Sequence, residues 1–306
     1  MAKRKEPITL DHVTLPPLAV SWLLNVEAAG RSANTLRAYS AALRQFFGHL
    51  GHDDIESLDG DTIRRWIIAM RKEGYGELSQ RIGYRVVRRF LKWCTAEKAI
   101  PANPTDNVDP PAVGKVRVIR TLSTDQIRDL LNIPGRDFQS LRDLSILSVL
   151  LDTGIRRMEC ANLSISAVNL SLGTVTVIGK GHGRSRTVPI GVKTRVTVDR
   201  YLRARARHNY AHREDIWLGQ QGALTYSGYE WVFHRHGLRI GVPGLHPHML
   251  RHTWASRARM AGMSEGNLMI LGGWESRDML DLYGAFEAAD RAEEAYRKNS
   301  VLDSMR

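Results

Sequence analysis

Apolar residues in the first hundred positions recur every three or four residues, which is the spacing of one face of an α-helix. The clearest run covers 32–50, begins at a Ser/Asn cap and ends at Gly51. Its apolar positions are Leu36, Tyr39, Leu43, Phe46 and Phe47. Similar patterns predict helices over 18–29, 61–72 and 78–99. This part of the chain is therefore predicted to be entirely helical.

The predicted helix over 78–99 carries positive charge along one side. At about 100° per residue, its basic residues fall within one narrow stripe, which consists of Arg81, Arg85, Arg88 and Lys92. The opposite side is apolar and consists of Ile82, Val86, Val87, Phe90, Leu91, Trp93 and Cys94. Like charges over three turns repel one another unless an anion neutralises them, whereas a merely solvated face usually mixes both signs. We therefore interpret the basic stripe as a surface that contacts phosphate.

Four prolines fall within 101–111, where they can neither continue a helix nor donate amide hydrogens to a sheet. They indicate a linker over 104–120 between a domain over 1–103 and a domain over 121–306. The second domain opens with the capping-box pattern Ser123-Thr-Asp-Gln126, which predicts a helix ending near Pro134. Further helices are predicted over 141–153 and 157–163. A small β-hairpin sheet is expected over 168–190, with helices again from 192 to the end.

The chain has 306 residues, a net charge of +12 and a pI near 10.0, which favours a polyanionic partner, either nucleic acid or an anionic membrane surface. No stretch approaches the roughly 18 apolar residues of a membrane span. The N-terminus shows no apolar core of a secretory signal. Cys94 and Cys160 have no metal-ligand spacing, so we expect two reduced core cysteines in a cytoplasmic protein. Nucleic acid is the favoured partner.

Four segments of the second domain hold residues suited to handling a phosphodiester. In chain order they are Thr153-Gly-Ile-Arg-Arg-Met-Glu159, Gly179-Lys-Gly-His-Gly183, His248-Met-Leu-Arg-His252 and Leu271-Gly-Gly-Trp274, the last followed nine residues later by Tyr283. Each alone has an ordinary explanation, such as surface arginines, a lysine in a turn or a packing tyrosine. What is specific is the occurrence of all four in this order.

This ordered series resembles the tyrosine recombinase, or phage integrase, family. The segment Ser-Ala-Asn-Thr-Leu-Arg-Ala-Tyr-Ser in the first domain is similar to the core-binding domain of that family, so the resemblance covers nearly the whole chain. It implies a mainly α protein. A helical, SAM-like core-binding domain would precede a mostly helical catalytic domain with a small antiparallel sheet, of the DNA breaking-rejoining enzyme type.

The resemblance also implies a role for each motif residue. Arg156 and Arg251 would grip the scissile phosphate, with Arg157 as the competing candidate for Arg156. Lys180 would protonate the leaving 5′-oxygen, His248 would act in acid–base catalysis, and Tyr283 would be the nucleophile. The supporting positions would be Trp274 at the second His/Trp position, Glu159 holding the first arginine, and His252 in a structural role.

These residue types fit phosphoryl transfer. Guanidinium groups match a phosphate bidentately and stay charged, so they can stabilise the charge that develops on its oxygens. A tyrosine with a pKa of about 10 is mostly neutral at pH 7 and therefore needs a proton acceptor. The series contains no acidic cluster at metal-binding spacing, which fits a reaction that needs neither metal nor cofactor. The resemblance further implies a 3′-phosphotyrosyl intermediate and strand exchange through a Holliday junction in a tetramer on double-stranded DNA.

The sequence departs from the family pattern at Trp274, where most members have histidine; an indole can donate a hydrogen bond but cannot exchange a proton. We also expect no arm-binding domain ahead of the core-binding domain, because the sequence begins almost at that domain. A helix predicted over 286–299 would dock on a neighbouring protomer or cap its own domain. The integrase of a phage or mobile element is the first hypothesis. The alternatives are an Xer-type chromosome-dimer or plasmid resolvase, a non-catalytic DNA-binding regulator with this fold, and a nicking activity like that of type IB topoisomerases.

Overall fold

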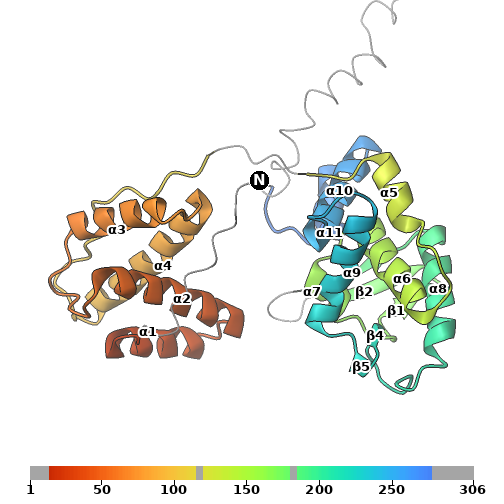
Figure 1. Ribbon diagram of the computed structural model, residues 1–306, viewed down its shortest axis with the longest axis horizontal. Coiled ribbons are helices and arrows are strands. Elements are labelled where there is room, and N and C mark those ends of the chain that lie inside the picture. Colours follow the sequence, from red (N-terminus) through yellow and green to blue (C-terminus); the bar gives the residue numbers. More distant parts are fainter. Residues whose placement is uncertain (1–13, 115–119, 180–184, 278–306) are drawn as a thin grey trace, which may run out of the picture. The chain divides into compact units, whose positions relative to one another are not determined.

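The computed structural model describes residues 14–114, 120–179 and 185–277, and it divides the chain at residues 117/118 into two compact units (Figure 1). Each unit has its own hydrophobic core. The two units together are mostly helical with small antiparallel sheets, which confirms the predicted fold class. Lys180, Tyr283 and the helix predicted over 286–299 lie outside the described residues.

The first unit consists of four helices in the part that the structure describes, as predicted: α1 (Pro17–Ala28), α2 (Ala33–Leu50), α3 (Gly60–Lys72) and α4 (Glu77–Ala96). Helix α2 begins where the Ser32 side chain accepts a hydrogen bond from the Thr35 amide, and it ends at Gly51 in the left-handed conformation. Helix α4 ends three residues earlier than predicted, because Lys98 adopts a φ of 61° and breaks the helical path. Large aromatic side chains, including Trp22, Trp66 and Phe90, fill the core.

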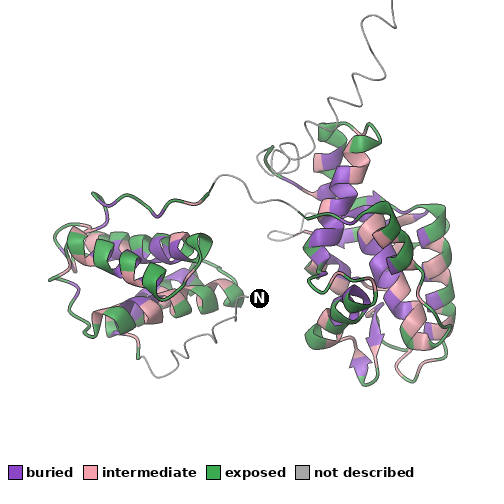
Figure 2. Cartoon of the chain, turned by 45° about the horizontal axis from the view of Figure 1, so that its top comes forward, coloured by how far each residue is buried: buried purple, intermediate pink, exposed green. Residues whose placement is uncertain are grey.

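The prediction that Ile82 lies on the apolar side of α4 is wrong. Ile82 is 46% exposed, whereas its neighbours Gly83 and Tyr84 are buried. A Cβ on Gly83 would lie 3.6–3.7 Å from Met70 and Trp66, so α3 approaches α4 closely at this glycine. The close approach places the buried side of α4 over 83, 87, 90 and 94 and leaves Ile82 at its margin. Figure 2 shows this division into buried and exposed sides along the helices of the unit.

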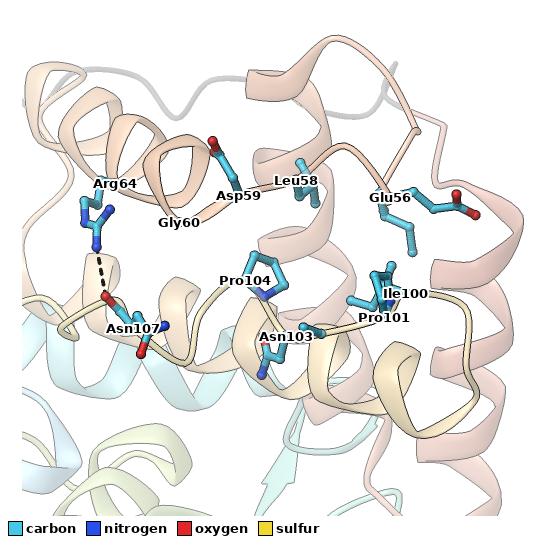
Figure 3. Close-up of a pocket in the computed structure, with 12 residues that line it drawn as sticks. Glu56, Leu58, Asp59, Gly60, Arg64, Ile100, Pro101, Asn103, Pro104 and Asn107 are labelled. Carbon is cyan, nitrogen blue, oxygen red and sulfur yellow. Dashed lines mark hydrogen bonds between the residues drawn. The ribbon is translucent and has the colours of Figure 1, made fainter.

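The chain that follows α4 packs back onto this unit. Tyr84 donates a hydrogen bond from its hydroxyl to the carbonyl of Val108 at 2.6 Å, and Arg64 donates to the carbonyl of Asn107 at 2.9 Å. Thr105 and Val108 are buried. The same segment borders a hollow of about 410 Å³ at the start of α3, in which Arg64 faces Asn107 (Figure 3). Residues 104–114, which the sequence assigned to a linker, therefore contact the first unit.

The second unit is built around α6 (Phe138–Thr153), which packs against α8 (Val192–Arg205) and α10 (Pro247–Met260). Its other helices are α5 (Thr124–Leu131), α7 (Arg157–Ala161), α9 (Tyr226–Arg239) and α11 (Glu265–Gly272). The predicted capping box is present, since Ser123 and Gln126 each accept a hydrogen bond from the other's backbone amide. Both cysteines are buried and free, and burial raises the pKa of each thiol to about 12.

The predicted sheet is an antiparallel three-stranded sheet in the order β1 (Val168–Asn169), β2 (Thr174–Ile178), β3 (Ser185–Pro189). Its register pairs Val177 with Arg186. A second pair of strands, β4 (Leu218–Gly219) and β5 (Gly222–Ala223), was not predicted, because two residues per strand are too few to show an alternating pattern. Among the described residues, the structure contains no helix long and apolar enough to cross a membrane.

Candidate active site

The first motif forms the junction between α6 and α7. Gly154 ends α6 with a φ of +60°, and Arg156 is the residue that precedes α7. Glu159 accepts a hydrogen bond from the Arg156 amide at 2.7 Å, which closes the first turn of α7. A Cβ on Gly154 would lie 2.0 Å from the indole of Trp254, so only glycine fits at this position. The motif therefore fixes the place where the Arg156 side chain leaves the backbone.

We expect Gly154→Ala to destabilise the second unit by about 2–5 kcal/mol, the sum of a left-handed alanine and an overpacked core. Gly262→Ala is the matched control, since Gly262 has a φ of +87° but no atom within 4 Å of its Cβ position. Urea unfolding of the two variants measures the difference. Equal losses of stability would show that Trp254 imposes no constraint on residue 154.

Arg156 and Glu159 belong to a partly buried ionic network that includes a third residue, Arg186 of β3. Arg156 donates to Glu159 Oε1 at 3.0 Å, and Arg186 donates to both carboxylate oxygens at 2.9 and 2.8 Å. Burial raises the pKa of Glu159, but the hydrogen bonds and charges of Arg186 and Arg156 outweigh it and hold this pKa below its ordinary value. Sequence reasoning missed Arg186, which lies outside all four motifs.

The third motif places His248, Arg251 and His252 on α10. Arg251 is 3% exposed and donates to the carbonyls of Gly154 at 2.5 Å and Gly272 at 2.7 Å. Its guanidinium carbon lies 4.3 Å from the centroid of the Trp274 ring, a cation–π contact. The α6–α7 junction, α10 and the end of α11 thus meet at this one arginine.

The end of α11 presents a row of carbonyls to the arginines. Arg156 donates to Gly273, Arg251 to Gly272, and Arg186 to Leu271 at 2.9 Å. Gly273 has a φ of +64°, and a Cβ there would lie 2.8 Å from the guanidinium carbon of Arg186. The helix C-terminus carries partial negative charge, which attracts guanidinium groups. The structure therefore brings together Arg156, Arg251 and Trp274, three of the residues that the resemblance assigned to the site.

His248 lies on α10 next to this group. Partial burial of the ring, together with the positive charges of Arg251 and the neighbouring His246, Arg157 and Arg156, lowers the pKa of His248 below its ordinary value. A lowered pKa favours the neutral imidazole, which is the form that can accept a proton. Burial and the nearby His248 lower the pKa of His252 further, to about 4.

The lowered pKa of His252 predicts acid sensitivity of the second unit. Between pH 6.5 and about 4 the unfolded chain binds a proton that the folded histidine does not, so stability falls as the pH falls through this window. We expect the urea midpoint for unfolding of the second unit to depend less on pH, between pH 7 and 4, in His252→Gln than in the wild type. Hydrogen exchange of α6 and α10 at increasing urea concentration measures this midpoint. A variant with the same slope as the wild type would show that His252 titrates normally.

Arg157, the competing candidate for Arg156, has other partners. Its guanidinium donates to Glu230 at 2.5 Å and lies 4.1 Å from the centroid of the Tyr226 ring, both on α9. Arg156 instead faces Glu159 and the end of α11. The geometry places Arg156, rather than Arg157, beside Arg251.

The basic stripe on α4 divides into two groups. Arg81 donates to the carbonyl of Pro111 at 2.8 Å, and Nη2 of Arg88 lies 3.9 Å from Oδ1 of Asp106. The segment after α4 therefore contacts both arginines. Arg88 is nevertheless exposed, as are Arg85 and Lys92, whereas Arg81 is half-buried. The hollow in the first unit has none of the described motif residues in its lining. Among the described residues there is also no group of three histidine, cysteine or acidic side chains that could hold a metal ion.

Two family models match this chain. The model of the phage integrase family matches residues 120–289, and the model of the phage integrase N-terminal SAM-like domain matches residues 21–98. The chain is 30% identical over 237 residues to tyrosine recombinase XerD of Halalkalibacterium halodurans, covering 74% of this chain and 78% of that protein. It is 31% identical over 230 residues to tyrosine recombinase XerC of Azotobacter vinelandii, covering 74% and 76%.

The fold is similar to that of solved recombinases. The integrase of transposon Tn1549, in complex with transposon right-end DNA, superposes with a TM-score of 0.76 at 18% identity and covers 93% of this chain and 98% of that one. At this identity the likeness concerns the fold, and it extends over both units of the chain.

Proposed function

This chain belongs to the phage integrase family and is a tyrosine site-specific recombinase. We propose that it cuts and rejoins duplex DNA at a specific site through a 3′-phosphotyrosyl intermediate and a Holliday junction. The observation that carries the proposal is the convergence of Arg156 and Arg251 on adjacent carbonyls at the end of α11, with His248 on the same helix as Arg251. Tyrosine replaces water as the nucleophile, so the energy of the phosphodiester is kept and religation needs no ATP.

The two arginines stabilise the phosphate as it is attacked. A guanidinium has five N–H donors, so it can hold a backbone carbonyl and a phosphate oxygen at once. The negative charge that develops on the non-bridging oxygens is then met by two fixed cations. Because Glu159 and the α11 carbonyls already orient the side chains, little reorganisation is needed when DNA binds.

Proton transfer at the two ends of the reaction is assigned to different groups. Neutral His248 accepts the proton of the Tyr283 phenol as its oxygen attacks phosphorus, and Lys180 protonates the 5′-oxygen as it leaves. Trp274 cannot replace a histidine in proton transfer, but its ring lies over Arg251 and fixes that guanidinium. His252, whose ring centroid lies 6.2 Å from that of His248 on α10, would have a structural role.

The first unit supplies DNA contacts in this proposal. Arg85, Arg88 and Lys92 are the exposed members of the α4 stripe and would contact phosphates directly, while the half-buried Arg81 would do so from its position beside the 101–114 segment. Four protomers would assemble on the double-stranded site, joined by the tail over 286–299. The enzyme would act in the cytoplasm, where its DNA substrate lies.

The biological role has two candidates. The Gly-Gly-Trp274 sequence and the likeness to a transposon integrase favour integration of a mobile element. The identity to XerD and XerC favours resolution of chromosome or plasmid dimers. Plasmids carrying two sites in direct or inverted orientation, with and without a second site on another plasmid, would show whether the enzyme joins molecules or resolves them.

The proposal is tested with a duplex selected from a random-sequence library for binding to the full chain, nicked in turn at each position of the bound site. We expect one nick position to trap a denaturant-resistant protein–DNA adduct in EDTA and without ATP. Binding without an adduct at any nick position would favour the non-catalytic regulator.

A further inference from the structure

We propose that Arg186 is a positioning residue of the cleavage reaction, which holds Glu159 and the end of α11 as one unit and thereby keeps Arg156 and Trp274 in place. The proposal rests on the proposed function for what the positioned residues do. Arg186 itself acts through its neighbours rather than on the DNA.

The contact between Arg186 and Glu159 has the geometry that fixes a side chain in direction as well as distance. The two terminal nitrogens of Arg186 each donate to a different oxygen of the carboxylate, at 2.9 and 2.8 Å. The side chains are 16% and 5% exposed, so water screens the pair little. Arg156 can then donate only to those lone pairs of the Glu159 carboxylate that do not already accept from Arg186. This restriction determines where the Arg156 guanidinium lies.

Further donors of Arg186 reach a different element. Its Nε donates to the carbonyl of Leu271 at 2.9 Å, and one terminal nitrogen lies 3.4 Å from the carbonyl of Gly272. These carbonyls belong to the last turn of α11, which only Gly273 separates from Trp274. Gly273 has no side chain where a Cβ would meet the guanidinium at 2.8 Å. The backbone is thus shaped to admit Arg186.

Arg186 also links these two contacts to a rigid element. It lies on β3, where its backbone register is set by pairing with Val177 of β2. Without its guanidinium, Glu159 would keep only the charge of Arg156, and the last turn of α11 would lose two hydrogen-bond donors. Both changes move groups that must be placed within a fraction of an ångström, and a displacement of about 1 Å can slow a reaction by about 10²-fold.

The test compares Arg186→Met and Arg186→Lys with a matched control, Arg205→Met. Arg205 is also buried and donates to four backbone carbonyls, of Ile216, Ala211, Arg213 and Asp215, but it contacts none of the described motif residues. Full-length proteins are measured for duplex binding, for the single-turnover rate of adduct formation on the nicked site, and for hydrogen exchange of the peptide that contains residues 270–277.

We expect Arg186→Met to bind DNA within about threefold of the wild type and to form the adduct about 10²-fold more slowly, with faster exchange at 270–277. Arg186→Lys keeps the charge but not the planar guanidinium fork, so its cleavage rate should lie between those of Arg186→Met and the wild type. Arg205→Met should lose stability without slowing cleavage by the folded protein. Unchanged exchange and a cleavage rate within threefold of the wild type in Arg186→Met would overturn the proposal. A wild type that binds but never cleaves would refute the proposed function, and the exchange data would still decide whether Arg186 holds α11.

Discussion

Tyr283→Phe is expected to bind the recombination site as the wild type does and to form no covalent adduct, a loss of about 10⁴-fold or more in the rate of cleavage. The substitution removes one oxygen atom from a ring that otherwise keeps its size and shape. No other group is expected to take over as nucleophile, because attack requires an oxygen in line with the leaving 5′-oxygen. Single-turnover incubation with the nicked duplex, followed by denaturing electrophoresis, measures the adduct.

Tyr226→Phe is the matched control for this substitution. Tyr226 lies on α9, is exposed, and contacts Arg157 through the face of its ring, which phenylalanine retains. We expect this variant to cleave within about threefold of the wild type, since only a hydroxyl outside the reaction is lost. An adduct formed by Tyr283→Phe at the wild-type rate would mean that another residue is the nucleophile.

Arg251→Lys is expected to slow adduct formation by about 10²–10³-fold although the charge is kept. Lysine is a single point charge without the planar fork, so it cannot hold the carbonyls of Gly154 and Gly272 and a phosphate oxygen together. It would also lose the stacking of a flat guanidinium on Trp274. Single-turnover kinetics at saturating protein separate this loss from any change in binding.

Arg257→Lys provides the control on the same helix. Arg257 donates to Thr124 at 2.9 Å, away from the carbonyls of α11. We expect this variant to cleave at nearly the wild-type rate, and thermal unfolding of both proteins checks that each is folded. If Arg251→Lys cleaves within tenfold of the wild type, Arg251 does not hold the phosphate in the way proposed.

The local signals in the sequence were good predictors of the fold. Ser32, Gly51 and the Ser123–Gln126 capping box predicted helix ends because each acts within one turn of its own chain. The same holds for the Gly154–Glu159 motif, whose glycine and N-terminal turn are local devices. Such features depend on near neighbours, and so the printed sequence already contains them.

Arg186 could not be predicted in this way. Its partners lie 27 residues away at Glu159 and 85 residues away at Leu271, and a single arginine on a short strand gives no sign of either. The helical pattern of α4 failed for a related reason. It ordered the residues correctly around the helix axis, but the centre of the buried side depends on the contact of Gly83 with α3. The partners of Arg81 and Arg88 likewise come from the segment after the helix.

The central claim is that Tyr283 becomes joined to a 3′-phosphate of DNA. Trypsin digestion of the trapped adduct, followed by mass spectrometry, tests it directly, because cleavage after Arg277 and Arg291 yields a peptide whose only tyrosine is residue 283. We predict that this peptide carries the nucleotide through its 3′-phosphate and that the released strand ends in a 5′-hydroxyl. A nucleotide on any other peptide, or a linkage through a 5′-phosphate, would contradict the account.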